Sequence, residues 1–304
     1  MNGKISNFQE IASLRRYTFT EGRERGLSVI DCDNGKIRFL LNASKALDIM
    51  QVYHKGMNVS FLSKNAFTER EIPFGKRFEG GMVYTCGLDS AGGGRPDFEM
   101  HGTFHNLTPE ITRAECGEDG ITVEATIRDT ALFGKNLVMK RKVFSAIGSD
   151  TLTLEDRLFN MGTKDEEYCL LYHTNVGYPM LDEGARIEAD VVNVEARSEF
   201  AISTKDKMFD ITADVPNQPE ACFYLTFKEP KISVVNPKVN KRLTVSYSGD
   251  TLPYFVEWKS MGSGDYAIGL EPSTTSLGNK FKYTTLKVGE SVRFFLSISV
   301  SDLS

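Results

Sequence analysis

Apolar and polar residues alternate with a period of two along most of this chain, and the 3.6-residue period of an amphipathic helix is rare. The alternating or continuously apolar segments are rich in Val, Ile, Thr, Phe and Tyr, a composition typical of β-strands. The strands predicted in this way cover residues 37–41, 120–127, 137–144, 151–159, 168–172, 221–226, 243–247 and 292–300. We expect no long helix and at most one short helical turn, at residues 43–49.

Short polar turns separate these predicted strands. They are Asp33-Asn34-Gly35, Glu118-Asp119-Gly120, Asn160-Met161-Gly162, Ser248-Gly249-Asp250 and Lys287-Val288-Gly289. Many strands joined by short turns favour an all-β fold, either a large antiparallel sandwich or a closed barrel. No internal repeat and no linker interrupts the pattern. We therefore predict a single domain over residues 1–304, with about the first twenty residues at its periphery.

The composition excludes several classes of protein. The 304 residues are 40% hydrophobic and 25% charged, as in ordinary globular proteins. The net charge is −5 and no stretch is rich in Lys and Arg, so nucleic acid is not expected as a partner. The five cysteines form no Cys-x-x-Cys pair, which indicates reduced thiols rather than a zinc knuckle. With no apolar signal-peptide segment and no membrane-spanning run, we expect a cytoplasmic protein without a membrane partner.

Three polar segments, each beside a predicted strand, carry the candidate chemistry. They lie at residues 100–106, 171–175 and 269–274. The first two hold three of the four histidines of the chain, and the third holds Glu271. A fold that joins these segments would place two imidazoles and one carboxylate in one pocket. That set is sufficient for proton transfer at neutral pH without a metal or a cofactor.

Each of these residues also has a purely structural interpretation. His101 precedes Gly102, which suits close approach of the backbone to a ligand, but it could equally be a hydrogen-bonded loop histidine. By strand alternation His173 shares a face with Asn175, and the alternative is a hydrogen-bonded core histidine. Glu271 ends an apolar run, where partial desolvation would raise the pKa of its carboxyl, and the alternative is a turn residue.

The remaining histidine of the first segment gives no metal site. His105 follows His101 by four residues, the spacing of two zinc ligands on a helix, but Gly102 and Thr103 disfavour a helix. No His-Glu-x-x-His motif is present, so we expect no metal and interpret His105 as a surface or loop residue. The glycine-rich residues 91–96 lack the Gly-Lys-Ser/Thr of a phosphate-binding loop and are interpreted as a flexible surface loop.

Four residues outside the three segments are weaker candidates for ligand contact. Trp258 could stack its ring on the apolar face of a sugar, or it could belong to the core. Lys259 and Arg77 are ordinary solvated charges unless they point into a pocket. Asp182 lies in a stretch whose composition is typical of a turn.

Taken in order, these segments resemble the aldose 1-epimerase (galactose mutarotase-like) superfamily, and most closely its epimerase-like bacterial branch (DUF4432-like). The similarity runs from about residue 20 to the C-terminus. It rests on four stretches: GGMVYTCGL at residues 80–88, His101-Gly102, YHTNVGYP at residues 172–179, and DYAIGLEPS at residues 265–273.

The resemblance implies a β-supersandwich, a pile of large, twisted, mostly antiparallel sheets with a concave groove for a sugar. It also implies cofactor-free interconversion of the α and β anomers of that sugar. Carried over residue by residue, Glu271 is similar to the general base that takes the proton from the anomeric hydroxyl. His173 is similar to the general acid that protonates the ring oxygen, and His101 to the histidine that assists near that oxygen.

The chain departs from this family at its sugar-binding positions. The Asn-Arg motif before the first histidine is not evident, and Arg77 is its closest stand-in. The acidic residue that grips sugar hydroxyls has two candidates, Glu257 and Asp182. Asn175, Trp258 and Lys259 complete the expected sugar contacts.

Three functions fit these residues. The first is a sugar mutarotase with a small-molecule sugar as its partner, acting as a monomer or homodimer without cofactor. The second is a carbohydrate-binding or sensing protein on the same scaffold, since a fold does not fix a function. The third is another carbohydrate enzyme, such as a lyase, isomerase or hydrolase. A glycosidase would need two carboxylates, and only Glu271 is a good candidate.

Overall fold

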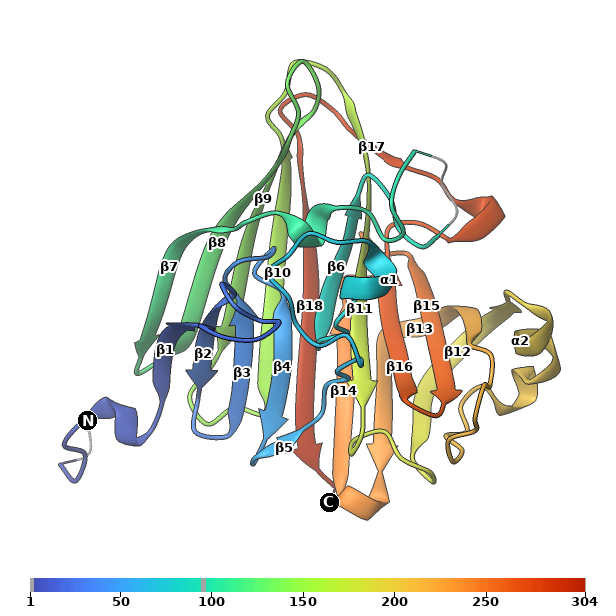
Figure 1. Cartoon of the computed structure of the whole chain (residues 1–304), viewed down its shortest axis with the longest axis horizontal. Coiled ribbons are helices and arrows are strands. Elements are labelled where there is room, and N and C mark those ends of the chain that lie inside the picture. The colour runs from blue at the N-terminus through green and yellow to red at the C-terminus, as the bar shows by residue number, and fades with distance from the viewer. Residues whose placement is uncertain (1–2, 94–96, 304) are drawn as a thin grey trace.

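The computed structural model describes residues 3–93 and 97–303, and it is almost entirely β-sheet (Figure 1). The strands are β1 (Ser13–Thr18), β2 (Ser28–Asp33), β3 (Ile37–Asn42), β4 (Ile49–His54), β5 (Met57–Asn58), β6 (Val83–Leu88), β7 (Glu110–Gly117), β8 (Gly120–Thr130), β9 (Asn136–Ser145), β10 (Thr151–Asn160), β11 (Glu166–Gly177), β12 (Arg186–Ala196), β13 (Ala221–Asn236), β14 (Lys241–Tyr247), β15 (Tyr254–Gly262), β16 (Asp265–Ser273), β17 (Thr284–Leu286) and β18 (Ser291–Asp302). The α-helices are α1 (Phe74–Arg77) and α2 (Glu199–Ser203), and the 3₁₀ turns are η1 (Phe8–Glu10), η2 (Phe104–Asn106), η3 (Lys205–Lys207), η4 (Pro237–Val239) and η5 (Gly278–Lys280).

The strands predicted from alternation are confirmed, because each predicted range lies within an observed strand. The observed strands are longer than predicted where both faces of a strand are buried, as in β11, since alternation is then lost. The helical turn expected at residues 43–49 is wrong. Residues 43–47 form turns in which Ala46 and Leu47 adopt the left-handed conformation, with φ of 48° and 52°, that cannot continue a right-handed helix.

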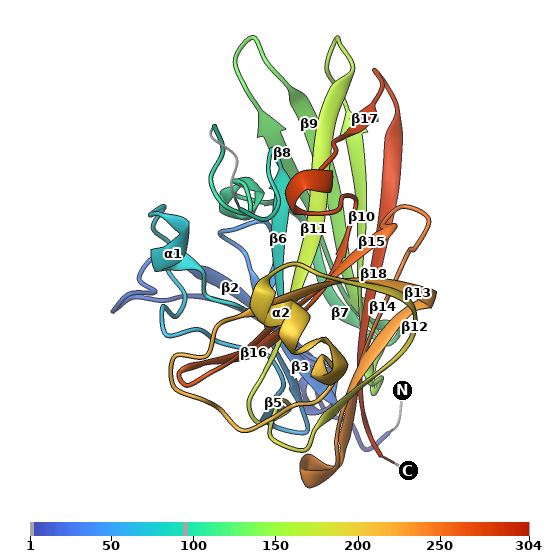
Figure 2. The same cartoon turned by 90° about the vertical axis from the view of Figure 1, so that its right-hand side faces the viewer.

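The strands form two antiparallel sheets. Of the two predicted alternatives, the fold is therefore a sandwich and not a closed barrel. The smaller sheet has the order β1-β2-β3-β4-β5. The larger, 13-stranded sheet follows the order β17-β11-β16-β15-β13-β14-β18-β10-β9-β8-β7, with β6 paired to β11 and β12 paired to β13. Figure 1 shows the smaller sheet lying in front of β7–β10, and Figure 2 views the molecule from the side that carries α2.

One hydrophobic core joins the two sheets. It contains side chains of the smaller sheet, such as Ile30 and Phe39, together with Val123, Leu154 and Phe294 of the larger sheet. A shared core of this kind suits the single domain that the sequence predicts. Near the N-terminus, β1 is the edge strand of the smaller sheet and is mostly exposed. Among the described residues, no helix has the length and apolar character needed to cross a membrane.

The two faces of β11 point into different apolar clusters. Leu170 and Tyr172 belong to the main core, whereas Leu171 faces a second cluster that includes Tyr84 of β6 and Val256 of β15. His173 shares the face of Leu171 because successive side chains alternate along a strand. The second face of β11 is therefore the one that carries the candidate site.

Candidate active site

His173 and Glu271 meet on adjacent antiparallel strands. The register of β11 against β16 pairs Leu171 with Ser273 and Thr174 with Leu270, so the two residues lie side by side across the ladder. Nε2 of His173 lies 3.1 Å from Oε1 of Glu271, and their side chains are only 6% and 2% exposed. The structure thus brings together two of the three predicted catalytic residues inside a buried environment.

His101 completes the cluster from the loop that follows β6. Its ring centroid lies 5.4 Å from that of His173, in an edge-to-face arrangement, and 5.0 Å from the ring of Phe74. The backbone of His101 is left-handed, with φ of 63°, and its Nδ1 accepts a hydrogen bond of 3.4 Å from the amide of Gly92. With Nδ1 accepting, the ring proton of neutral His101 resides on Nε2 and is free to be donated.

The glycine after His101 is required by close packing. Gly102 has φ of 71°, and a Cβ at this position would lie 2.4 Å from the carboxylate of Asp89 and 2.5 Å from the carbonyl oxygen of Gly87. The amide of Gly87 in turn donates a hydrogen bond to the carbonyl of His101, at 3.0 Å. These contacts fix the loop so that the imidazole of His101 turns toward β11.

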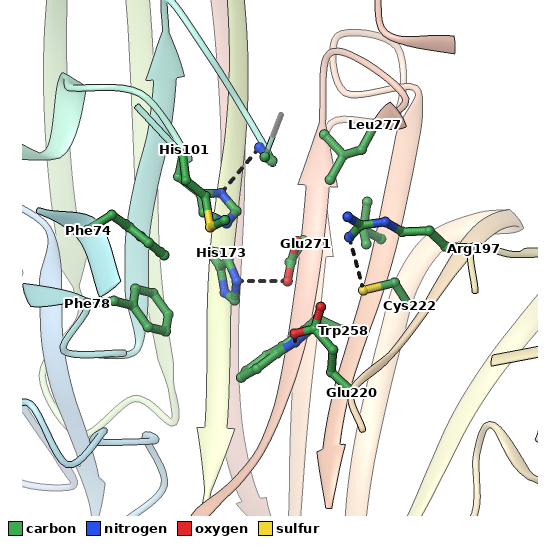
Figure 3. A pocket seen from close by; sticks show the side chains of 14 residues that line it. Phe74, Phe78, His101, His173, Arg197, Glu220, Cys222, Trp258, Glu271 and Leu277 are labelled. Atoms are coloured by element: carbon green, nitrogen blue, oxygen red, sulfur yellow. Dashed lines mark hydrogen bonds and ion pairs between the residues drawn. The ribbon is translucent and has the colours of Figure 1, made fainter. Parts of the chain in front are cut away.

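The three residues line one pocket of about 200 Å³ (Figure 3). Phe74 and Phe78 form one wall, and Arg197 and Glu220 stand opposite, with His173 and Glu271 between the two walls. Further lining residues are Gly92, Gly93, Met100, Cys222, Val256, Trp258 and Leu277. A small, mostly apolar hollow with a few convergent polar groups is typical of a small-molecule site.

Burial makes both histidines of the pocket weak bases. Desolvation lowers the pKa of His101 to about 4, and the positive charge of Arg197 adds to this effect. Desolvation also lowers the pKa of His173 well below its usual value, and His101 adds to that shift while the amide of Asn175 opposes it. Both imidazoles are therefore neutral at pH 7.

Burial acts in the opposite direction on the carboxyl of Glu271. Desolvation raises the pKa of Glu271 well above its usual value, the negative charge of Glu220 adds to the shift, and Arg197 opposes it. A carboxyl with a raised pKa beside an imidazole with a lowered pKa holds one mobile proton between the two groups. Acid and base groups whose pKa values are displaced in this way are typical of catalytic sites.

Among the described residues, Nδ1 of His173 has no hydrogen-bond partner, and Oε1 of Glu271 has only its 3.1 Å contact with Nε2 of His173. Both atoms are fully buried. Because a buried polar atom without a partner costs about 1–3 kcal/mol, such atoms in a native pocket point to a ligand or bound water.

Gly269 makes room for the pair. It precedes Glu271 by two residues on the same face of β16, and a Cβ on Gly269 would lie 2.3 Å from Oε1 of Glu271. The same Cβ would lie 3.1 Å from Cε1 of His173 and 3.2 Å from Cβ of Trp258. The absence of a side chain at this position is therefore a condition for the contact between His173 and Glu271.

Of the predicted sugar-binding residues, Trp258 lines the pocket and Asn175 lies next to it along β11. Trp258 lines the pocket, its indole nitrogen donates to Oε2 of Glu220 at 2.7 Å, and its ring lies 5.5 Å from that of His173. Asn175 lies two residues beyond His173, and its side-chain amide donates to the carbonyl of His173 at 2.9 Å. Asn175 therefore supports the strand segment that carries His173, and it does not line the pocket.

Arg77 lies outside the pocket, which corrects the expectation that it contacts sugar. Its guanidinium is 1% exposed and binds Glu99 in a bidentate pair, with N–O distances of 2.7 and 2.8 Å. Glu99 also accepts from the amide of Phe74, at 2.7 Å, and its carbonyl accepts from Gly102, at 3.0 Å. Arg77 thus ties α1 to the loop that carries His101.

Glu257 and Lys259 lie on the opposite face of β15 from Trp258, because side chains alternate along the strand. Glu257 is fully buried, and desolvation raises the pKa of its carboxyl to about 8. The Nζ of Lys259 donates to the carbonyls of residues 207, 208 and 210, which holds the segment after α2 against the sheet. We therefore do not include these two residues in the site.

Asp182 is the remaining predicted sugar contact, and it is also outside the pocket. It lies in the turn between β11 and β12, where Lys238 donates to its carboxylate at 3.0 Å. The turn interpretation of the sequence fits this position. The structure offers Glu220 instead as the acidic residue that faces the pocket.

Sequence reasoning missed Arg197, Glu220 and the aromatic wall of Phe74 and Phe78. Arg197 and Glu220 lie in irregular segments before α2 and before β13, where no periodic pattern marks a residue as inward-pointing. Phe74 begins α1, and Phe78 directly follows it. Their spacing of four residues was the one signal in the sequence that could have indicated that the two rings lie on the same face. The predicted glycine-rich loop falls partly on residues 94–96, which lie outside the described residues.

His105 is buried rather than exposed, which corrects its interpretation as a surface residue. Its Nδ1 lies 2.7 Å from Asp48 and its Nε2 lies 2.9 Å from Glu79, and the ring stacks on Tyr84 at 3.9 Å. Desolvation lowers the pKa of His105, but the two carboxylates outweigh it and raise the pKa to about 9. Asp48 also accepts from the buried guanidinium of Arg141, so this network connects the smaller sheet to the larger one.

In the part of the chain that the structure describes, no group of three or more His, Cys, Asp and Glu side chains is arranged to hold a metal ion. None of the five cysteines forms a disulfide, and Cys222 lines the pocket.

Comparison with known proteins identifies the fold. The family described as a domain of unknown function (DUF4432) matches residues 24–300. A protein of Klebsiella pneumoniae described as a "putative aldose 1-epimerase" superposes with a TM-score of 0.85 at 19% identity, covering 95% of this chain and 83% of that chain. A galactose mutarotase-like protein of Clostridium acetobutylicum has a TM-score of 0.70 at 14% identity, covering 97% and 100%. No curated relative matches the sequence.

These likenesses confirm the predicted fold class. The chain has the galactose mutarotase-like fold, with large antiparallel sheets, as the sequence resemblance implied. Identities below 20% with the two solved structures establish the fold and leave the activity to be argued from the pocket.

Proposed function

This chain belongs to the DUF4432 family, and we propose that it is a sugar mutarotase that interconverts the α and β anomers of a small sugar by acid–base catalysis. The proposal assigns Glu271 and His173 to proton transfer and His101 to assistance at the ring oxygen. The apolar wall of Phe74 and Phe78 and the ring of Trp258 suit the C–H faces of a pyranose.

The observation that carries the proposal is the 3.1 Å contact between His173 and Glu271 in a buried pocket. In a cyclic sugar the anomeric hydroxyl and the ring oxygen are both bonded to C1. A proton acceptor for one oxygen and a proton donor for the other must therefore lie within a few ångströms of each other. A carboxyl and an imidazole that hold one mobile proton between them meet this requirement.

Ring opening begins from the minor form of the pair, in which the shared proton has passed from Glu271 to His173. Glu271 takes the proton of the anomeric hydroxyl, and His173 gives its proton to the ring oxygen as the bond between C1 and that oxygen breaks. The product is the open-chain aldehyde, which rotates about the bond between C1 and C2. Ring closure then takes place on the other face of the carbonyl. Glu271 returns its proton to the anomeric oxygen, and His173 takes back the proton that it gave to the ring oxygen, so both groups regain their starting forms.

His101 suits the side of the ring oxygen. Its pKa of about 4 keeps the imidazole neutral, and its Nδ1 accepts from Gly92, so Nε2–H is the available donor. A hydrogen bond from a neutral donor stabilises the negative charge that develops on the ring oxygen without adding a full charge to an apolar pocket. A matched acid and base contribute about 10²–10⁴-fold, which suffices for a reaction that already proceeds in water.

The test is catalysed anomer exchange, measured by saturation-transfer NMR on hexoses, pentoses, deoxysugars and sugar acids. We expect exchange above the buffer rate for at least one sugar. Absence of exchange with every sugar, in folded protein, would contradict the proposal. Binding of a sugar without exchange would favour the alternative of a carbohydrate-binding protein.

A further inference from the structure

A second hollow of about 430 Å³ continues the same sheet face beyond the active-site pocket. Val256 of β15 lines both hollows. The second hollow is also lined by side chains with hydroxyl or ammonium groups, namely Tyr224, Thr226, Tyr254, Ser276 and Lys282. Because the two hollows share a wall residue, they are neighbours on this face of the sheet.

The register of the strands shows how the hollows are related. On β13, Cys222 lines the first hollow and Tyr224, two residues further along the same face, lines the second. On the segment that ends β12, Arg197 lines the first and Glu195 lines the second. A displacement of two residues along a strand is about 6–7 Å, a length that suits the step from one sugar ring to the next.

The chemistry of the second hollow suits a saccharide ring. The ring of Tyr254 is 42% exposed in the hollow, which leaves an aromatic face for stacking. The hydroxyl of Tyr224 is buried and has no hydrogen-bond partner among the described residues. The exposed side chain of Lys282 makes no ion pair with any described residue, while its backbone amide is fixed by Thr275 at 2.9 Å. An aromatic face surrounded by unused donors and acceptors is the combination that sugar hydroxyls and C–H faces require.

One ion pair crosses this hollow and is weak enough to yield. Lys280 binds Glu195 at 2.5 Å, with side chains that are 66% and 47% exposed. Exposed pairs of this kind contribute little to stability, so a ligand hydroxyl can replace either partner at little cost.

We propose that the second hollow binds a second saccharide ring, so that the substrate is a reducing disaccharide or a longer reducing oligosaccharide. This inference rests on the proposed function, because the reducing ring would occupy the pocket of His173 and Glu271. The next ring would then stack on Tyr254, within reach of the Tyr224 hydroxyl and the Lys282 ammonium.

The experiment compares maltose, cellobiose and lactose with glucose, since all three disaccharides carry glucose at the reducing end. We expect at least one disaccharide to show a KM for anomer exchange at least about tenfold below that of glucose. Tyr254→Ala removes this difference and leaves the KM for glucose unchanged, whereas Tyr254→Phe retains it because the ring remains. Tyr17→Ala, a matched change of a tyrosine that is 37% exposed on the smaller sheet, is the control. Equal or higher KM values for all three disaccharides would overturn the inference.

Direct binding separates this inference from the proposed function. Saturation-transfer difference NMR with the same three disaccharides reports occupancy even if no sugar is exchanged. A signal from the non-reducing ring that is lost in Tyr254→Ala supports the second subsite, even where absent exchange has contradicted the mutarotase. Absence of any such signal in the unmodified protein overturns the subsite, even where glucose is exchanged.

Discussion

Nε2 of His173 and Oε1 of Glu271 lie 3.1 Å apart on neighbouring strands, and both side chains are almost completely buried. The guanidinium of Arg197 lowers the pKa of Glu271, but desolvation outweighs this effect. The pKa values of His173 and Glu271 are displaced in opposite directions by the same desolvation. The two groups therefore act as one proton-holding unit, and changes to either of them should have closely similar consequences.

Glu271→Gln should reduce anomer exchange by about 10²–10⁴-fold, because an amide neither takes nor returns the proton of the anomeric hydroxyl. The fold should be retained, since the amide is isosteric and carries no charge to desolvate. Saturation-transfer NMR measures the rate, and thermal unfolding checks the fold. Glu229→Gln, which changes an exposed carboxylate, is the control. Unchanged exchange in Glu271→Gln would remove the assignment of Glu271 as the base.

Gly269→Ala should abolish most exchange while changing no titratable group. The added Cβ would lie 2.3 Å from Oε1 of Glu271, so the carboxyl must move away from His173. Gly117→Ala is the matched control, because a Cβ there meets nothing within 4 Å. We expect kcat to fall in Gly269→Ala and to stay constant in the control. A Gly269→Ala protein with full activity would show that the short contact is dispensable.

The pH profile of exchange should remain flat well below pH 6.5. His101 and His173 have lowered pKa values, about 4 for His101, so both stay neutral until the solution is more acidic than an ordinary histidine requires. In alkaline solution the exchange rate should fall at the pH where the pair loses its shared proton. This pH lies above the usual pKa of a carboxyl, because burial raises the pKa of Glu271. Rates corrected for buffer catalysis test this, and an acid limb at pH 6.5 would contradict it.

His105 should stabilise the protein in acid and neutral solution and lose that contribution in alkali. Its folded pKa of about 9 lies above the unfolded value of 6.5. The stabilisation is therefore complete below pH 6.5 and disappears as the pH rises through about 9. From this difference the contribution is on the order of 3 kcal/mol.

Urea unfolding of the unmodified protein and of His105→Gln, at pH 6 and at pH 10, measures that contribution. The difference in unfolding free energy between the two proteins should shrink at the higher pH. Because Tyr, Lys and Cys groups titrate in both proteins, the comparison isolates His105. A difference that is independent of pH would show that His105 is not protonated between Asp48 and Glu79.

Arg77→Gln should lower kcat and leave KM nearly unchanged. The pair of buried Arg77 with partly exposed Glu99 holds the loop that carries His101, so its loss displaces the residue to which we assign a hydrogen bond to the ring oxygen. Glu99→Gln should give the same result, and the double variant should be no worse than either single variant, because both changes break one interaction. A raised KM with constant kcat would instead restore Arg77 as a sugar contact.

Several parts of the fold were predictable from local pattern. Alternation located the strands such as β9 and β18 to within a few residues, because the face on which a side chain lies depends only on its neighbours along the strand. Turn residues such as Asp33-Asn34-Gly35 marked where β2 gives way to β3. The resemblance of four short stretches to a known superfamily predicted that His101, His173 and Glu271 belong together, and all three line one pocket.

The sequence could not locate the sugar-binding side chains. Trp258 and Glu257 are consecutive, yet one lines the pocket and the other is buried behind the sheet. Which of the two faces the pocket depends on how β15 registers against β16. Arg197 and Glu220 lie in irregular segments whose direction is set by the packing of α2 and β13.

The sequence by itself determined the all-β class, the strands and the residue types available for proton transfer, since these follow from short-range periodicity and composition. Only the tertiary structure decided which of those residues meet. The contact of His173 with Glu271 depends on the order of β11 and β16 in the sheet and on a register in which one slipped residue would turn Glu271 to the opposite face. Burial, and hence the displaced pKa values that make the pair chemically useful, is likewise a property of the packed molecule.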